Sequence, residues 1–101
     1  MEYTLNENGE TIDLVFQGKF SFSDSELVKG IISEVKKSDC KNCSIDATAL
    51  TAIDSAGLGM LLLVNDALKE NDKDMVLHGA AGQVLKMLEI SKFSEIITIK
   101  A

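Results

Sequence analysis

Three places in the sequence carry side chains that could do chemistry. Cys40 and Cys43 form a C-x-x-C pair, His78 is the single histidine, and Ser55 follows Asp54 just before an apolar segment. Serine and aspartate often begin helices, because their side chains accept hydrogen bonds from the first backbone N–H groups. A helix N-terminus also favours negative charge. We therefore expect Ser55 at the start of a helix, either as its N-terminal cap or as a group that another protein can reach.

The cysteine pair lacks the sequence context of a redox or metal site. In thioredoxin-like enzymes such a pair follows a strand and opens a helix, whose N-terminus lowers the thiol pKa. Here the pair from Cys40 to Cys43 comes after a predicted helix and before a predicted strand. A zinc site needs about four ligands, and His78 is far away in the sequence. A dithiol redox protein is therefore only a remote alternative, and we expect no metal and no cofactor.

No other motif indicates an enzyme. His78 has no Ser or Cys nucleophile beside it in the sequence, so the sequence does not define a triad. Asp72 and Asp74 lie in a charged turn, and Gly57-x-Gly59 is too little for a phosphate-binding loop. We therefore expect a protein without catalytic activity.

Length and charge narrow the function classes further. The chain has 101 residues, which predicts a single domain over 1–101. A net charge of −6 without a basic stripe argues against nucleic-acid binding. The longest apolar run, Leu58 to Val64, is far below the roughly 20 residues that span a bilayer. The acidic N-terminus does not have the pattern of a signal segment. We expect a cytoplasmic protein without membrane insertion, most simply an acidic monomer.

Apolar periodicity predicts an α/β domain. Tyr3–Leu5 and Thr11–Phe16 flank Asn8-Gly9, a strong hairpin signal, and Gly18 is expected to end this hairpin. The other elements are expected at these ranges: helices at 24–37, 55–70 and about 81–88, and strands at 44–47, 75–78 and 96–99. Strands alternating with helices predict a mixed β-sheet with an N-terminal hairpin and about three to four helices packed on it.

The connectors and helix faces give further expectations. Ser23-x-x-Glu26 has the spacing of a capping box for the first helix. Phe20 and Phe22 are expected to pack in the core. A helical wheel of the second helix assigns one broad arc to the core, namely Met60, Leu61, Leu63, Val64, Ala67 and Leu68. The opposite, solvated arc holds Asn65, Asp66, Lys69 and Glu70, and with them Leu58 and Leu62. Leucines on the solvated face near Ser55 would suit a docking surface, unless a neighbouring loop or helix covers them.

Residues 53–62 carry a recognisable motif. Asp54-Ser55 followed by Gly57-Leu58-Gly59 resembles the signature of STAS domains, specifically that of bacterial anti-sigma-factor antagonists. Residues 84–97 are similar to the family's closing helix and strand. With the order of elements, the resemblance covers essentially the whole chain and implies a single STAS-like domain.

The resemblance implies a binding module that is itself a substrate. The unphosphorylated protein would bind a serine kinase that also serves as an anti-sigma factor, phosphorylation of Ser55 would release it, and a PP2C-type phosphatase would restore binding. The implied partner-binding residues are Asp54, Ser55, Ala56, Gly57, Leu58, Gly59 and Leu62. Ala56 replaces a frequent second hydroxyl residue. Residues 18–24 differ from the Gly-Glu-x-Asp of many relatives, which leaves the partner's identity open. The alternative is a constitutive STAS accessory or scaffold subunit, for example of a membrane transport complex, with Ser55 as a plain N-cap.

Overall fold

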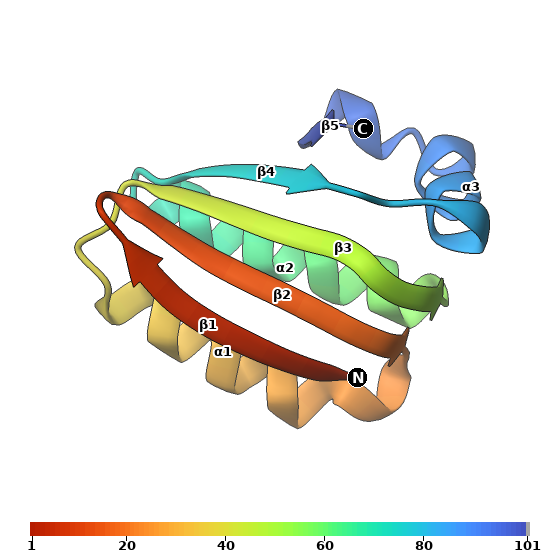
Figure 1. Ribbon diagram of the computed structural model, residues 1–101, viewed down its shortest axis with the longest axis horizontal. Helices are drawn as coiled ribbons and strands as arrows, with labels where there is room; N and C mark the ends of the chain where they lie inside the picture. The colour runs from red at the N-terminus through yellow and green to blue at the C-terminus, as the bar shows by residue number, and fades with distance from the viewer. Residues whose placement is uncertain (101) are drawn as a thin grey trace.

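A five-stranded sheet forms the centre of the structure, a computed structural model that describes residues 1–100 (Figure 1). Its strands are β1 (Glu2–Asn8), β2 (Thr11–Phe20), β3 (Asn42–Ile53), β4 (Asp74–His78) and β5 (Thr98–Lys100). They lie side by side in chain order, with β1 antiparallel to β2 and all other pairs parallel. The helices are α1 (Ser25–Lys37), α2 (Ser55–Glu70) and α3 (Gly82–Ile90), with 3₁₀ helices at Phe22–Asp24 and Phe93–Glu95. The predicted mixed sheet with an N-terminal hairpin is confirmed.

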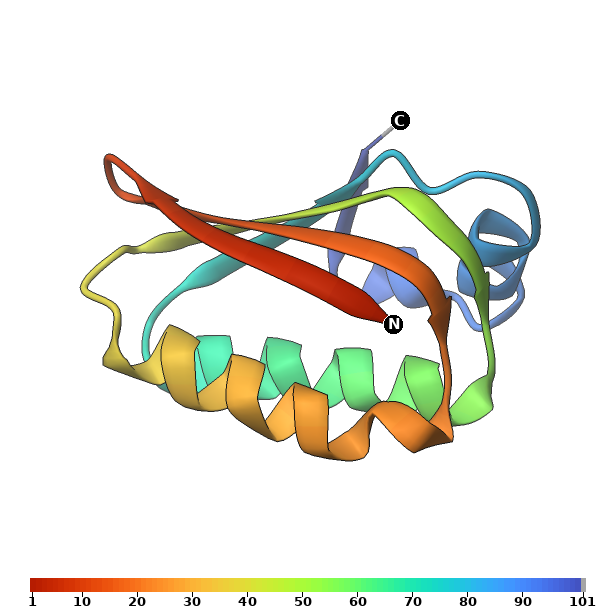
Figure 2. The ribbon, with the colours of Figure 1, turned by 60° about the horizontal axis from the view of Figure 1, so that its bottom comes forward.

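The helices cover one face and one end of the sheet. α1 and α2 lie side by side under the same face, whereas α3 lies near the end at which β3 stops (Figure 2). Alternate residues of the strands point toward the helices, as the pleat requires. The largest fully buried side chains are Phe16, Phe20, Ile12, Leu14, Ile31, Ile45, Leu61, Leu68, Leu77, Leu88, Val35 and Val64. None of the helices within residues 1–100 is long and apolar enough to cross a membrane.

Both long parallel strands continue further than the sequence suggests. Gly18 does not end β2; it adopts a φ of +87° where the pairing with β3 shifts register, and the strand continues to Phe20. The strand predicted at 44–47 is also longer than expected, because β3 extends to Ile53. The two register shifts insert extra β3 residues opposite β2 and so interrupt the alternation of buried and exposed positions. That interruption made the second half of β3 resemble a loop.

The connector after β2 also differs from expectation. The carboxylate of Asp24, not that of Glu26, closes a turn by accepting a hydrogen bond from the Ser21 backbone N–H at 2.8 Å. α1 accordingly begins at Ser25. Phe20 packs in the core as predicted, with its ring edge-on to Phe16 at 5.8 Å between centroids.

Two other expectations about single elements are wrong. The side chain of Phe22 lies on the surface and is 74% exposed, because the short 3₁₀ helix turns it away from the sheet. At the other end of the chain, Ile96 and Ile97 follow the second 3₁₀ helix and the last strand begins only at Thr98.

Candidate functional site

The entrance of α2 is built directly on the end of β3. Asp54 is the N-cap, and its Oδ1 accepts a hydrogen bond from the Gly57 N–H at 2.7 Å. Ser55 is the first helical residue, and both Ser55 and Ala56 are exposed. The predicted helix start at Ser55 is confirmed. The reading of Ser55 as a plain N-cap is wrong, because Asp54 fills that position.

Backbone hydrogen bonds fix this entrance to the neighbouring strand. The N–H of Asp54 donates to the Phe20 carbonyl at 3.2 Å, and the N–H of Leu58 donates to the Asp54 carbonyl at 3.0 Å. The first N–H groups of a helix lack partners within it. With the Gly57 N–H bound to Asp54, the N–H groups of Ser55 and Ala56 are the two that remain directed out of the helix entrance.

The two glycines of the first turns have different roles. A Cβ atom at Gly57 would lie 2.6 Å from the Phe20 carbonyl oxygen and 2.8 Å from Cγ1 of Ile53. Gly57 is therefore buried, and its lack of a Cβ atom lets α2 pack closely against the ends of β2 and β3. Gly59 is exposed, and a Cβ atom there would meet nothing within 4 Å. Of the two, only Gly59 leaves backbone open to an approaching molecule.

The exposed face of α2 differs from the predicted one. Leu58 is buried with 7% exposure, Asn65 is buried with 5%, and Leu62 is half-buried. Leu63, expected in the core, is 55% exposed. α2 packs against α1 as well as the sheet, so its buried arc is wider and rotated relative to the arc assigned from hydropathy alone. Within α2, the apolar contribution to the surface near Ser55 therefore comes from Leu62 and Leu63, not from Leu58.

A residue of α3 completes the site. The side-chain amide of Gln83 makes two hydrogen bonds with the backbone of Ile53: the Ile53 N–H donates to Oε1 at 2.9 Å, and Nε2 donates to the Ile53 carbonyl at 3.0 Å. Sequence reasoning missed Gln83, since no local pattern relates it to a strand that ends 30 residues earlier. A surface hollow of about 310 Å³ lies here, lined by Lys19, Phe20, Ser21, Ala52, Ile53, Asp54 and Gln83.

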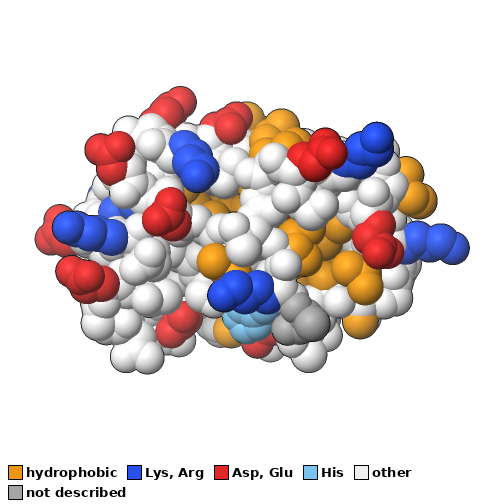
Figure 3. All heavy atoms as spheres, turned by 90° about the horizontal axis from the view of Figure 1, so that it is seen from above, with side chains coloured by type: hydrophobic (Ala, Val, Ile, Leu, Met, Phe, Trp, Pro, Cys, Tyr) orange, Lys and Arg blue, Asp and Glu red, His pale blue; other side chains and the backbone are white. Residues whose placement is uncertain are grey.

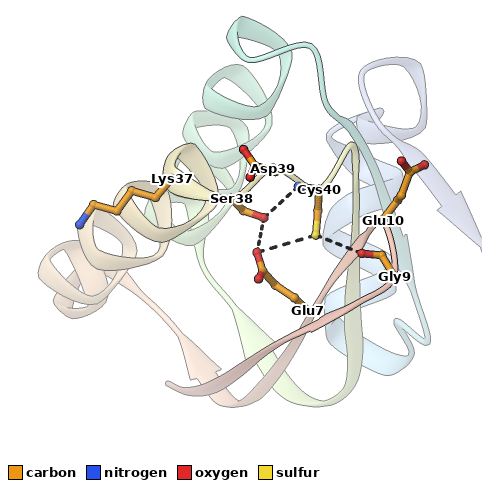
Figure 4. A pocket seen from close by; sticks show the side chains of 7 residues that line it. All are labelled: Glu7, Gly9, Glu10, Lys37, Ser38, Asp39 and Cys40. Carbon is orange, nitrogen blue, oxygen red and sulfur yellow. Dashed lines mark hydrogen bonds between the residues drawn. The ribbon is translucent and has the colours of Figure 1, made fainter.

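The C-x-x-C pair has no disulfide and lies away from this site. Both cysteines are buried and free. Burial raises the pKa of the Cys43 thiol to about 12, with a further contribution from the Asp13 carboxylate. The Cys40 thiol lies 3.7 Å from both the Glu7 Oε1 and the Gly9 carbonyl, beside a surface hollow of about 390 Å³ (Figure 4). With its pKa raised, the buried Cys43 thiol stays protonated and is a poor nucleophile, which argues against dithiol redox chemistry.

Of the other residues considered for chemistry, Asp72 lies in the turn before β4, and Asp74 and His78 are the first and last residues of β4. His78 Nε2 is 2.9 Å from the Ser44 Oγ on the neighbouring strand. Hydrogen bonds from Thr48 hold the pKa of the Asp46 carboxyl below its ordinary value, and the backbone N–H of Thr48 donates to it at 2.9 Å. Among residues 1–100, no group of three or more His, Cys, Asp or Glu side chains is arranged to hold a metal ion.

Apolar side chains also reach the surface elsewhere. Ile90, at the end of α3, is 69% exposed and Ile96 is 45% exposed. Figure 3 shows hydrophobic side chains between charged ones on the side of the molecule that carries β4 and the C-terminal segment. The exposed residues Ile90 and Ile96 belong to α3 and the C-terminal segment, not to α2.

Comparison with known proteins defines the class. The family model described as Mlab, STAS domain matches residues 3–98. The match covers nearly the whole sequence, so the chain belongs to the STAS domain family, and the resemblance inferred from the motif is confirmed.

Its relatives include anti-sigma factor antagonists. The anti-sigma-B factor antagonist of Listeria monocytogenes is 27% identical over 89 residues, covering 88% of this chain and 78% of that protein. The anti-sigma factor antagonist SpoIIAA in its unphosphorylated form matches with a TM-score of 0.75 and 17% identity, over 99% of this chain and 88% of that chain. The sulfate transporter family protein of Wolinella succinogenes matches with a TM-score of 0.77 and 17% identity, over 89% of this chain and 73% of that chain. The structural matches show the shared fold.

Proposed function

We propose that this protein is an anti-sigma-factor antagonist controlled by phosphorylation of Ser55, a binding module without catalytic activity. The observation that carries the proposal is the exposed Ser55 at the first position of α2, next to the N-cap residue Asp54. Membership of the STAS family and the antagonist relatives support it. In its unphosphorylated form the protein binds a serine kinase that is also an anti-sigma factor.

The helix entrance suits a phosphate without a change of fold. Phosphorylation adds about −1.5 to −2 charges at pH 7. A helix N-terminus favours such an anion, and the N–H groups of Ser55 and Ala56, which have no acceptor among residues 1–100, point out of it. The modified residue is exposed, so the phosphate displaces no core contact.

The negative charge of the phosphate also weakens binding of a partner at this surface. The first two turns of α2 carry no charged side chain: Ala56 and Gly59 are exposed, and Leu62 and Leu63 continue this stripe two turns from Ser55. A partner packed on this stripe would have to desolvate the phosphate next to the Asp54 carboxylate, which is costly. Phosphorylation therefore releases the partner, and a PP2C-type phosphatase restores binding.

A second serine provides a matched comparison. Ser25 is the first residue of α1 and follows Asp24, as Ser55 follows Asp54. Asp24 is buried, however, with Oδ1 2.9 Å from the Met1 α-ammonium, and Glu26 adds a charge to the same turn. Ser55 stands in a turn with no acidic residue of its own and with glycine and alanine neighbours. We therefore assign the modification to Ser55 alone.

The experiment is phosphorylation by the serine kinase encoded nearest to this gene, followed by site mapping with mass spectrometry. Wild-type protein and Ser25→Ala are expected to take up one phosphate at Ser55, and Ser55→Ala none. In calorimetric titration, Ser55→Ala binds the kinase like the unmodified protein, and Ser55→Asp binds about tenfold more weakly or worse, through repulsion and desolvation. Equal affinity of the two variants, or a phosphate on another residue, would overturn the proposal.

The apolar stripe supports a second candidate, a constitutive accessory or scaffold subunit of, for example, a membrane transport complex. Leu62 and Leu63 would then be covered permanently and Ser55 would stay unmodified. In that case a complex isolated from cells contains unphosphorylated protein under every condition. Pull-down of Ser55→Ala and wild-type protein under changing growth conditions separates the candidates, because only the switch predicts a difference between them.

A further inference from the structure

β3 extends beyond β4 at the end of the sheet that carries Ser55. β4 pairs with β3 only as far as Asp46, which lies opposite His78. β2 pairs with β3 as far as Ile53, which lies opposite Phe20. Residues 47–53 of β3 thus have a strand neighbour on one side only. Backbone groups directed to the other side need partners from elsewhere.

α3 supplies that partner through one side chain. In an extended strand the N–H and C=O of one residue point to the same side, and those of the next residue point to the opposite side. The Asp54 N–H turns toward β2 and donates to the Phe20 carbonyl at 3.2 Å. Both polar groups of Ile53 point away from β2 and bond to the Gln83 amide, at 2.9 and 3.0 Å.

A carboxamide is suited to this task. It presents a carbonyl acceptor and an N–H donor side by side, as a neighbouring strand would. A carboxylate could accept from the Ile53 N–H but would face the Ile53 carbonyl without a proton to donate. The bonds occur where the Ile53 side chain is buried (3% exposure), although Gln83 itself is exposed. Gln83 therefore acts through its hydrogen bonds to the Ile53 backbone and not through apolar contacts in the core.

We propose that Gln83 is a positioning residue for Ser55. Together with the Phe20 carbonyl it holds the end of β3 from both sides, two residues before the serine, and so fixes where the Ser55 hydroxyl is presented. The importance of that hydroxyl rests on the proposed function. The effect of Gln83 on its position can be measured without any partner.

Hydrogen exchange measured by NMR tests the pairing. In Gln83→Ala the Ile53 amide is expected to exchange about tenfold faster, because two part-buried hydrogen bonds are lost. Gln83→Glu is expected to fall between wild type and Gln83→Ala. Lys86→Ala, an exposed position on the same helix, is the control and should leave this amide unchanged. An unchanged rate in Gln83→Ala would overturn the proposal.

A reporter thiol tests the position of residue 55. In Ser55→Cys a thiol at the first helical position is expected to have a pKa below its ordinary value of about 8.5. The pKa is read from the pH profile of alkylation, with the label mapped to residue 55. Adding Gln83→Ala is expected to move this pKa back toward the ordinary value, whereas adding Lys86→Ala is not. A profile that Gln83→Ala does not change would contradict the positioning role.

The kinase assay separates this inference from the proposed function. Gln83→Ala is expected to lower kcat for phosphorylation of Ser55 by about tenfold or more through misplacement of the hydroxyl, with a smaller effect on KM. Wild-type protein that no kinase phosphorylates at Ser55 would overturn the proposed function, while the exchange and thiol results would still decide the role of Gln83. Phosphorylation of Gln83→Ala at the wild-type rate would overturn the positioning role alone.

Discussion

Gly57 lies directly against the carbonyl group of Phe20, so that a Cβ atom at position 57 would be 2.6 Å from the Phe20 oxygen. The same carbonyl accepts the Asp54 N–H at 3.2 Å. The end of β2 and the first turn of α2 therefore form one unit. The position of Ser55 therefore depends on the contact between Gly57 and Phe20 as well as on β3, the strand that precedes Ser55.

Gly57→Ala is expected to destabilise the fold by about 1–3 kcal/mol, because the backbone of β2 must move to admit the methyl group. Gly59→Ala is the matched control, since a Cβ atom at position 59 meets nothing within 4 Å. It is expected to stabilise the protein by about 0.5–1 kcal/mol through helix propensity. Urea denaturation measures both free energies. The close packing of Gly57 is refuted if the two variants shift the midpoint in the same direction.

The rotated face of α2 predicts opposite behaviour for two leucines. Leu58→Ala, at a buried position, should cost about 2–5 kcal/mol of unfolding free energy. Leu63→Gln, at a position that is 55% exposed, should change stability by no more than about 0.5 kcal/mol. If the partner docks on this stripe, Leu63→Gln also weakens binding in a calorimetric titration. Full-strength binding by Leu63→Gln would remove Leu63 from the interface.

Asp54 caps α2, and its removal should be measurable in isolation. Asp54→Ala is expected to lower the free energy of unfolding by about 1 kcal/mol, since the Gly57 N–H loses its acceptor at 2.7 Å. Asp54→Asn keeps an acceptor oxygen and should cost less. Asp66→Ala, at an exposed position further along the same helix, serves as the control in the same denaturation series. A loss in Asp66→Ala as large as that in Asp54→Ala would argue against the capping role.

Asp46 should contribute to acid sensitivity. Hydrogen bonds from Thr48 lower its pKa in the folded protein, so its ionised form favours the folded state. This stabilisation is complete above the unfolded-state pKa and is lost as the pH falls through the lower, folded-state pKa. Unfolding free energies measured from pH 7 down to pH 3 should fall less steeply for Asp46→Asn than for wild type. Curves of the same slope would contradict the prediction.

The Cys43 thiol should be unreactive in the folded protein. Its pKa of about 12, raised mainly by burial, leaves almost no thiolate at pH 8. Iodoacetamide at pH 8 is expected to leave Cys43 unlabelled in the native state and to label it in urea, as peptide mass mapping would show. Rapid labelling of the native protein would reopen the redox alternative.

Local signals in the sequence were sufficient for much of the fold. The Asn8-Gly9 turn, the period of apolar residues and the Asp54-Ser55 pair correctly predict the hairpin, the order of elements and the start of α2. They succeed because turn chemistry, helix capping and amphipathic spacing act over a few neighbouring residues.

Other features depend on contacts between distant parts of the chain. The bulges in β3 are defined by its pairing with β2. Because they interrupt the alternation of buried and exposed residues, the sequence alone does not show how far the strand extends. Burial of Leu58 and exposure of Leu63 depend on how α1 lies beside α2, which hydropathy along one helix does not encode. Gln83 reaches Ile53 only because α3 occupies the space beyond the end of β4. The sequence thus determined which residue stands at the helix entrance, and tertiary packing decided which side chains surround it and hold it in place.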